Sequence, residues 1–418
     1  MNLRLLGKRT AVALLIATAT LATACTVPGD PMPQHLNPAA LRTGIYTAEP
    51  LDAPPGTDAY GRVLEAVRLS EAMIDPIEAD SALTAQLELG GLFLMPTPVK
   101  AATLLAEPVR AVLERRGMIT GAAVGGADRT MVRHPTTGTF RALTLMVFRF
   151  PDTASAQAAA SEIDATDAAV STENVAVTIP DYPAAHAHWR PNVPTLAATM
   201  ASGTSVISLL AAHTAIDLPA LTALAHNGFD KQERRLRDYQ PTPADTLATL
   251  PLDPDKMLSR MVPTAPGRWP YPEVITFANE VIAGWDSSLY ASGVVLGPRA
   301  SQLFGGRVTG RVPAEARAIN NLNSLFRFPT AAAARAAFER QTGKDKENGL
   351  TTMPLPDGIA AQDMHCTLST AQTDKLGLSK YLCVIRYGRY LAAVFSRDAT
   401  NVLEKASAQY GLLVGGGS

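Results

Sequence analysis

The sequence predicts an α+β protein of two tandem, duplicated domains, whose antiparallel sheets are packed by Ala-rich helices. The motif Phe-Arg-Phe-Pro occurs at residues 148–151 and again at 326–329. Each copy follows a strand-like run and precedes an Ala-rich stretch that has the composition of a helix. Strands followed by helices, twice over and without a regular βαβ rhythm, are typical of α+β folds.

Composition and charge narrow the class of protein. A chain of 418 residues allows two or three domains. Its 47% hydrophobic and 18% charged residues are typical of a globular protein. The formal net charge of −1 argues against nucleic acid as a partner, because nucleic-acid binding needs a basic excess or stripe.

The first 24 residues have the composition of a signal peptide. Positive residues precede an apolar run at 11–21, which is too short to span a membrane comfortably. After the N-terminus no run of 18 apolar residues occurs, which excludes a multi-pass membrane protein. We therefore expect residues 1–24 to direct export and to be removed.

Cys25 follows this segment in a context that resembles a bacterial lipobox. In that motif a small residue precedes a cysteine that is diacylated and becomes the new N-terminus. The pattern usually has Leu three positions before the cysteine, where this chain has Ala22, with Leu21 one position further back. The resemblance implies an N-terminal diacylglycerol-cysteine, palmitate among its acyl chains, that anchors the protein to the outer face of the cell membrane. The alternative is an ordinary cleaved signal with a chance cysteine.

Residues 25–43 are predicted to be the lipidated cysteine and a tether. The segment is rich in proline, which favours extended polyproline conformations and leaves no core of its own. Two acyl chains would hold such a tether at the membrane stably, whereas one chain binds only marginally.

The N-terminal α+β domain is predicted to span residues 44–240. An apolar stripe predicts a helix over 58–73. Asp152 is placed to cap a helix over 153–168, and a further helix is predicted over 218–236.

Residues 241–272 are predicted to be a Pro-rich linker with a short helix at 255–261. The C-terminal α+β domain follows at 273–415. In it Thr330 takes the place of Asp152 and caps a helix over 331–342.

A second block supports the duplication. Residues 387–395 have the pattern of a hairpin tip with its outgoing strand, and residues 202–210 are the counterpart in the first half. Helices follow both blocks, and Asp398 is placed to cap the second.

The two cysteines that remain, Cys366 and Cys383, are predicted to form a disulfide. An even pair in an exported chain favours this interpretation, and the closed loop would stabilise the fold by about 3 kcal/mol. A redox or metal site is the alternative, but further ligands at metal spacing are missing from the sequence.

No catalytic constellation is recognisable, so no catalytic residue and no cofactor are expected. The most suggestive local motif is His186-Ala187-His188. On a strand the two imidazoles would share a face and could bind zinc or copper. A polar surface stretch is the blander interpretation.

Four aromatic residues lie around the predicted linker: Trp269, Tyr271, Phe277 and Trp285. Ligand sites commonly lie between domains, so these residues are candidates for a ligand groove. Aromatic side chains that pack two domains together would explain the pattern equally well.

The chain resembles a family of exported actinobacterial lipoproteins of unknown function. The segments that carry the resemblance are the lipobox, residues 41–46, 61–66, 252–254, 297–300 and 408–413, and the two Arg-Phe-Pro segments with their Ala-rich helices. The resemblance implies an envelope lipoprotein with two related domains and supplies no catalytic residues. A fainter similarity exists to the exported sensor domains of actinobacterial Ser/Thr kinases.

These observations lead us to expect a non-enzymatic binding or accessory lipoprotein of the cell envelope. Its partner would be a lipid, a glycolipid, a cell-wall fragment or a protein. The alternatives are an envelope hydrolase or transferase with an unrecognised site, and a structural or sensory subunit of a membrane complex.

Overall fold

The computed structural model describes most of the chain from residue 40 to residue 416. It leaves out residues 1–39, 87–90, 130–135, 283–284, 306–310, 346, 370–379 and 417–418, and the side chains of 277–288. The predicted signal peptide, Cys25 and nearly all of the predicted tether therefore lie outside the described residues. No helix in the described part is long and apolar enough to cross a membrane.

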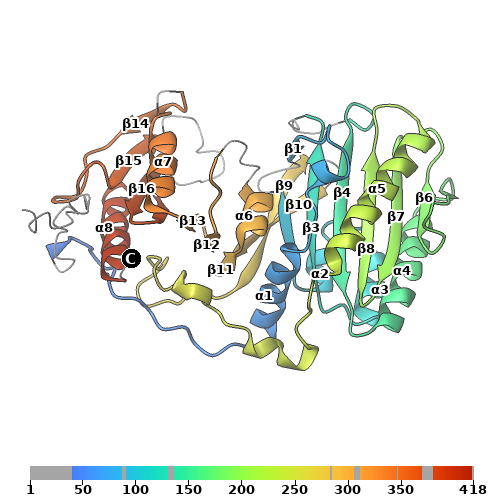
Figure 1. The fold of residues 1–418 in the computed structure, drawn as a ribbon, viewed down its shortest axis with the longest axis horizontal. Helices are drawn as coiled ribbons and strands as arrows, with labels where there is room; N and C mark the ends of the chain where they lie inside the picture. Colours follow the sequence, from blue (N-terminus) through green and yellow to red (C-terminus); the bar gives the residue numbers. More distant parts are fainter. Residues whose placement is uncertain are drawn as a thin grey trace, which may run out of the picture. The chain divides into compact units, whose positions relative to one another are not determined.

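The N-terminal half forms an eight-stranded antiparallel sheet (Figure 1). Its strand order is β1-β3-β4-β8-β7-β6-β5, with β2 also paired to β3. The strands are β1 (Ala85–Gln86), β2 (Leu92–Met95), β3 (Thr120–Ala127), β4 (Ala142–Arg149), β5 (Val175–Ala176), β6 (His186–Trp189), β7 (Thr195–Ser202) and β8 (Ser205–Ala212).

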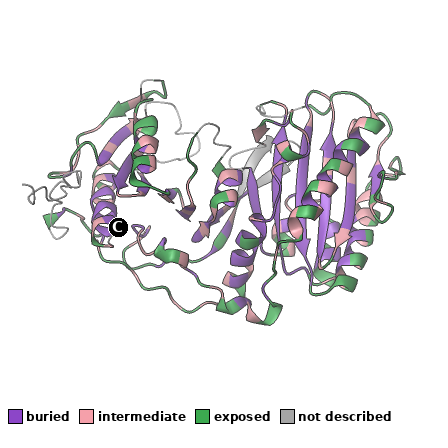
Figure 2. Cartoon of the chain, viewed as in Figure 1, coloured by how far each residue is buried: buried purple, intermediate pink, exposed green. Residues whose placement is uncertain are grey.

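Helices cover both faces of this sheet. They are α1 (Asp58–Ser70), α2 (Pro98–Ala101), α3 (Val109–Arg115), α4 (Thr153–Ala168) and α5 (Leu218–Leu236). Gly228 of α5 lies against Leu143 and Leu209. Arg149 lies on the same side of β4 as Leu143 and binds Glu65 of α1, so α1 and α5 cover the same face. The opposite side of the sheet carries His188, which contacts Asp164 of α4, and α3 packs beside α4. All residues of β3 and β4 are consequently buried (Figure 2).

The C-terminal half begins with the two-stranded hairpin β9 (Glu273–Ile282) and β10 (Trp285–Ser292). A seven-stranded antiparallel sheet follows in the order β11-β12-β13-β17-β16-β15-β14. Its elements are β11 (Val294–Leu296), α6 (Pro298–Gly305), β12 (Ala316–Asn320), β13 (Asn323–Arg327), α7 (Ala331–Thr342), β14 (Leu350–Thr352), β15 (Met364–Ser369), β16 (Tyr381–Tyr387), β17 (Tyr390–Ser396) and α8 (Ala399–Gly415).

The two sheets have the same topology, which confirms the predicted α+β duplication. Strands β2, β3, β4, β5, β6, β7 and β8 correspond in chain order and in sheet position to β11, β12, β13, β14, β15, β16 and β17. Helices α4 and α5 likewise correspond to α7 and α8. Among the described residues, the hairpin β9–β10 has no such counterpart in the N-terminal half.

The Phe-Arg-Phe-Pro motif ends equivalent strands, β4 and β13. In the first copy the Phe150 N–H donates to the Thr204 carbonyl, and in the second the Phe328 N–H donates to the Arg389 carbonyl, both at 2.8 Å. Each acceptor lies in the tight turn before the last strand of its sheet. These turns contain Gly203 and Gly388 at positive φ (60° and 51°), a conformation that glycine adopts without strain. The motif is therefore a strand end that is tied to the neighbouring hairpin.

The predicted helix caps are confirmed. The Asp152 side chain accepts the Ser155 N–H and the Thr330 side chain accepts the Ala333 N–H, so α4 and α7 begin where the sequence indicates. The Asp398 side chain caps α8 in the same way.

The predicted helix at 255–261 is wrong. Pro254–Lys256 forms only a 3-10 turn, in which Asp255 and Lys256 have positive φ. The Asp253 carboxylate accepts the N–H groups of Leu258 and Ser259, so these groups bond to a side chain instead of to a preceding helical turn.

The last helix of each half holds an upstream segment through a buried glutamine. Gln232 of α5 accepts the Ile74 N–H (2.9 Å) and donates to the Ala72 carbonyl (2.8 Å). Gln409 of α8 accepts the Val262 N–H (3.0 Å) and donates to the Arg260 carbonyl (2.7 Å). Both glutamines are fully buried, so these bonds satisfy amide groups that have no access to water.

Candidate functional site

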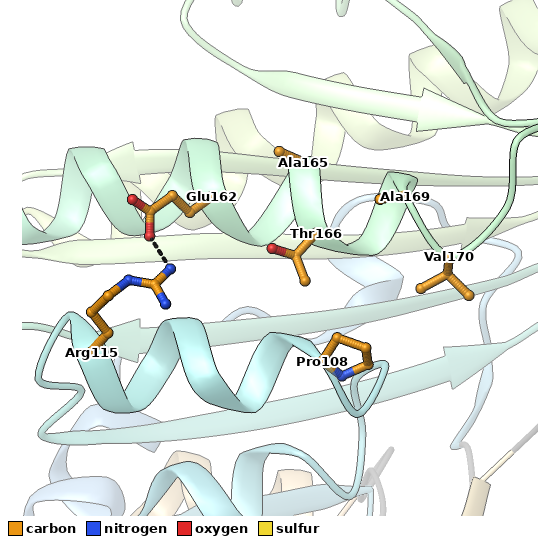
Figure 3. Close-up of a pocket in the computed structure, with 7 residues that line it drawn as sticks. All are labelled: Pro108, Arg115, Glu162, Ala165, Thr166, Ala169 and Val170. Atoms are coloured by element: carbon orange, nitrogen blue, oxygen red, sulfur yellow. Dashed lines mark hydrogen bonds and ion pairs between the residues drawn. The ribbon is translucent and has the colours of Figure 1, made fainter.

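A groove between α3 and α4 is the candidate ligand site (Figure 3). It has a volume of about 410 Å³ and lies on the face of the N-terminal sheet that α4 covers. The residues that line it are Pro108, Arg115, Glu162, Ala165, Thr166, Ala169 and Val170. Four of these residues recur at helical spacing along α4 and its C-cap, so one side of the helix forms a whole wall of the groove.

One end of the groove is charged. The Glu162 carboxylate accepts hydrogen bonds from Arg115 Nη2 (2.7 Å) and from Arg116 Nε (3.1 Å). Hydrogen bonds from Arg116, which has the larger effect, and from Arg115 lower the pKa of Glu162 to about 2. Two guanidinium groups thus share one carboxylate, which leaves this end with a net positive charge.

The remainder of the groove is mostly apolar, apart from the Thr166 hydroxyl. Ala165 and Ala169 provide small side chains, and Val170 and Pro108 close the far end (Figure 3). Val170 is 59% exposed, so its side chain is accessible to a ligand in the groove. The groove can therefore hold an apolar group with an anionic end beside the arginines.

His188 and His186 have different environments. His188 Nδ1 lies 2.8 Å from Asp164 Oδ1, and Nε2 lies 3.5 Å from Asp167 Oδ2. Burial lowers the pKa of His188, but the two carboxylates outweigh burial and raise the pKa to about 9. The ring is therefore an imidazolium at neutral pH, whereas a metal binds neutral imidazole. His186 is exposed, and the described residues contain no group of three metal-ligating side chains.

Two of the four aromatic candidates have side chains that the structure describes, and these two lie in different surroundings. Trp269 is buried, and Tyr271 is 40% exposed and stacks on Tyr60 with ring centroids 5.2 Å apart. Phe277 lies on β9 and Trp285 on β10, but their side chains lie outside the described part of the structure.

Cys366 and Cys383 form a disulfide between β15 and β16. The two residues are direct partners in the strand register, and both are fully buried. Their position matches Ala187 and Ala198 in the first repeat, which are direct partners on β6 and β7.

Sequence reasoning missed a buried ion pair between α1 and β4. Glu65 is fully buried, and its carboxylate accepts hydrogen bonds from Arg149 Nη1 (2.9 Å), the Thr242 N–H (2.9 Å) and the Thr242 hydroxyl (2.7 Å). Tyr239 also donates to Glu65, and burial followed by the Glu65 charge raises the pKa of this phenol. The cluster holds the start of the linker against the N-terminal domain.

The signal for this cluster was the arginine of the repeated motif. Arg149 donates to the Thr242 carbonyl, and its counterpart Arg327 pairs with Asp255 at 2.8 Å. Equivalent arginines of the two repeats thus contact the predicted linker at two points.

Both halves of the chain match domain families of unknown function. Residues 52–252 match the model of a domain of unknown function, DUF7373 N-terminal, and residues 257–416 match DUF7373 C-terminal. No curated protein matches the chain. Among solved structures, the extracellular domain of PknH from Mycobacterium tuberculosis is 12% identical with a TM-score of 0.27, over 44% of this chain and 100% of that domain.

Proposed function

The chain belongs to the DUF7373 family, whose N-terminal and C-terminal domains it carries in tandem, and on that premise we propose that it is an exported envelope lipoprotein with a non-enzymatic binding role. A diacylglycerol group on Cys25 would hold it at the outer face of the cell membrane. The two domains would present a binding surface for an envelope lipid, a glycolipid, a cell-wall fragment or a partner protein.

The cysteines carry this proposal. The chain has three, and two of them form the buried disulfide between β15 and β16. Structural disulfides form and persist in oxidising compartments outside the cytoplasm. The third, Cys25, stands directly after the signal-like segment, where lipid attachment takes place in proteins that carry a lipobox. One cysteine for the anchor and two for the disulfide account for all three.

The groove between α3 and α4 supports the binding role. Its volume of about 410 Å³ falls in the range of small-molecule sites, and it combines an apolar wall with a positively charged end. Amphipathic molecules with an anionic group, which envelope lipids and glycolipids include, would suit that combination.

The anchor is tested by comparing the full chain with the variant Cys25→Ser in an exporting host. We expect the full chain to enter the detergent phase on Triton X-114 partition, and Cys25→Ser to stay in the aqueous phase. The intact mass of the mature full chain should include two or more acyl chains on residue 25. A Cys25→Ser protein that still enters the detergent phase would refute the anchor.

The binding role is tested with native mass spectrometry of the exported Cys25→Ser form, followed by organic extraction. We expect a stoichiometric bound lipid or glycan, and its loss in Ala165→Trp, which fills the groove. Ala154→Trp, at an exposed alanine of the same helix away from the groove, is the matched control and should keep the ligand. Equal retention by both variants would exclude the groove as the site.

A further inference from the structure

Arg317 lies among aromatic rings on the face of the C-terminal sheet that corresponds to the groove face. It is on β12, directly opposite Phe326 of β13 in the strand register. Its Cζ atom lies 4.9 Å from the centroid of the Phe326 ring and 4.7 Å from that of Phe304 on α6. Both rings make cation–π contacts with the guanidinium, so its apolar surroundings hold it in place.

Within the described residues this cation has no acidic partner. Among these residues it makes one hydrogen bond, from Nη2 to the Ser324 hydroxyl at 3.4 Å, and its Nε is buried without an acceptor. Burial lowers the pKa of Arg317, and the one opposing charge effect comes from Tyr290. The guanidinium has five N–H donors, so most of its capacity for hydrogen bonds is unused.

Other arginines show how unusual this environment is. In the described chain, six more have a buried Nε without an acceptor: Arg141, Arg149, Arg190, Arg260, Arg327 and Arg389. Each of these six pairs with a carboxylate or donates to a backbone carbonyl. Arg317 is half-buried with a buried Nε, and among the described residues it has neither kind of partner, which distinguishes it from the other six.

The fold itself does not require an arginine here. The equivalent position of the N-terminal sheet, opposite Phe148 on β4, is Gly121, where a Cβ would lie only 2.9 Å from the Phe148 ring. The same topology is thus built with an aromatic ring closed over glycine. In the C-terminal domain a different glycine, Gly305 at the end of α6, lies beside the guanidinium. A Cβ at Gly305 would lie 2.6 Å from Arg317 Nη1. Gly305 therefore lets the Arg317 guanidinium approach the backbone of α6 closely, whereas the N-terminal repeat has a glycine in place of the arginine itself.

We propose that Arg317 is an anion subsite of the C-terminal domain, which binds the oxyanion of a small ligand, carboxylate or phosphate, with the Ser324 hydroxyl as a second donor. A guanidinium can give two parallel hydrogen bonds to either oxyanion, and such charge-assisted bonds are about twice as strong as those between neutral groups. The subsite is separate from the groove between α3 and α4 and does not depend on the lipid anchor.

The test uses the exported Cys25→Ser chain, with sodium acetate and sodium phosphate as probes at constant ionic strength. One arginine Nε–Hε signal in the proton–nitrogen NMR spectrum, assigned by its absence in Arg317→Met, should shift and saturate with at least one probe. The thermal midpoint should rise with the logarithm of that probe's concentration. Acetate alone would identify a carboxylate ligand, and phosphate alone a phosphate ligand.

Two variants and one control complete the test. Arg317→Met should abolish the midpoint rise. Gly305→Ala, which crowds Nη1, should weaken binding about tenfold, the effect of losing one charged hydrogen bond. Arg335→Met, at an exposed arginine of α7, should bind as the parent does. If neither probe shifts the Arg317 signal of the parent chain, or if Gly305→Ala binds as tightly as the parent, the subsite is refuted even where Arg317→Met fails to fold.

Discussion

In the N-terminal sheet β3 and β4 are buried along their whole length, whereas every strand of the C-terminal sheet has at least one partly exposed residue. The helices differ in the same sense, since α4 has 16 residues and its counterpart α7 has 12. Where the first repeat has the buried pair Ala187–Ala198, the second has the disulfide. A smaller core gains less from apolar burial, and a covalent link offsets that deficit.

The repeated arginines show the same contrast. Arg149 pairs with the fully buried Glu65, but Arg327 pairs with Asp255, whose side chain is 61% exposed. One motif position therefore contributes a buried ion pair in one domain and a surface ion pair in the other, and the two should differ in their effect on stability.

Glu65→Gln is expected to have the largest effect. It leaves the Arg149 charge buried without its carboxylate, which costs about 3–5 kcal/mol of the free energy of unfolding. Asp255→Asn removes an exposed partner and should cost about 0–1 kcal/mol. Urea denaturation followed by hydrogen exchange of peptides from each domain measures both. Equal losses in the two variants would show that burial does not separate the two pairs.

The double variant Cys366→Ala/Cys383→Ala gives the second repeat the alanine pair of the first. We expect the C-terminal domain to lose about 3 kcal/mol through the larger conformational freedom of its unfolded chain. Peptides of the N-terminal domain should keep their exchange protection. The parent chain under reducing conditions is the control, and a variant as stable as the oxidised parent would contradict the role given to the disulfide.

The third difference depends on pH. The pKa of His188 is about 9 in the folded protein and about 6.5 when unfolded, so folding takes up a proton between these values. The contribution of His188 to stability is fully present below about pH 6.5 and is lost as the pH rises through about 9. We expect the N-terminal domain to lose about 1–3 kcal/mol over this range. In His188→Gln this part of the pH dependence should disappear. If the dependence of stability on pH is the same in this variant, the contacts of His188 with Asp164 and Asp167 do not stabilise the domain.

The smallest expected effects test what the repeats share. Asp152→Ala and Thr330→Ala each remove one side-chain cap from equivalent helices, so each should cost about 1 kcal/mol in its own domain. Thermal unfolding with domain-resolved hydrogen exchange compares them. A loss confined to one of the two would mean that the shared motif stabilises only that repeat.

Local features of the fold could be read from the sequence. The caps Asp152 and Thr330 and the helices at 153–168, 218–236 and 331–342 depend on residues close in the chain. The helix expected at 58–73 ends at Ser70, where the chain turns. The Phe-Arg-Phe-Pro repeat predicted the duplication because it ends the same strand of each sheet.

Features that depend on distant partners could not be predicted. Glu65 and Arg149 are 84 residues apart, and although Arg149 belongs to the repeated motif, nothing in the sequence identifies Glu65 as its partner. The groove between α3 and α4 exists because two helices pack side by side, and Arg317 stands out only once its surroundings are known. His188 was singled out by its neighbour His186, but its partners come from α4.

The glutamines of the last helices have a consequence for synthesis. Gln232 satisfies Ile74 from 158 residues downstream, and Gln409 satisfies Val262 from 147 residues downstream. Because the chain is synthesised from its N-terminus, the Ile74 and Val262 N–H groups lack their native acceptors until the last helix of each domain has been made. Neither domain can be completed step by step behind the ribosome. Each domain can therefore form its full set of native hydrogen bonds only after its last helix has been synthesised.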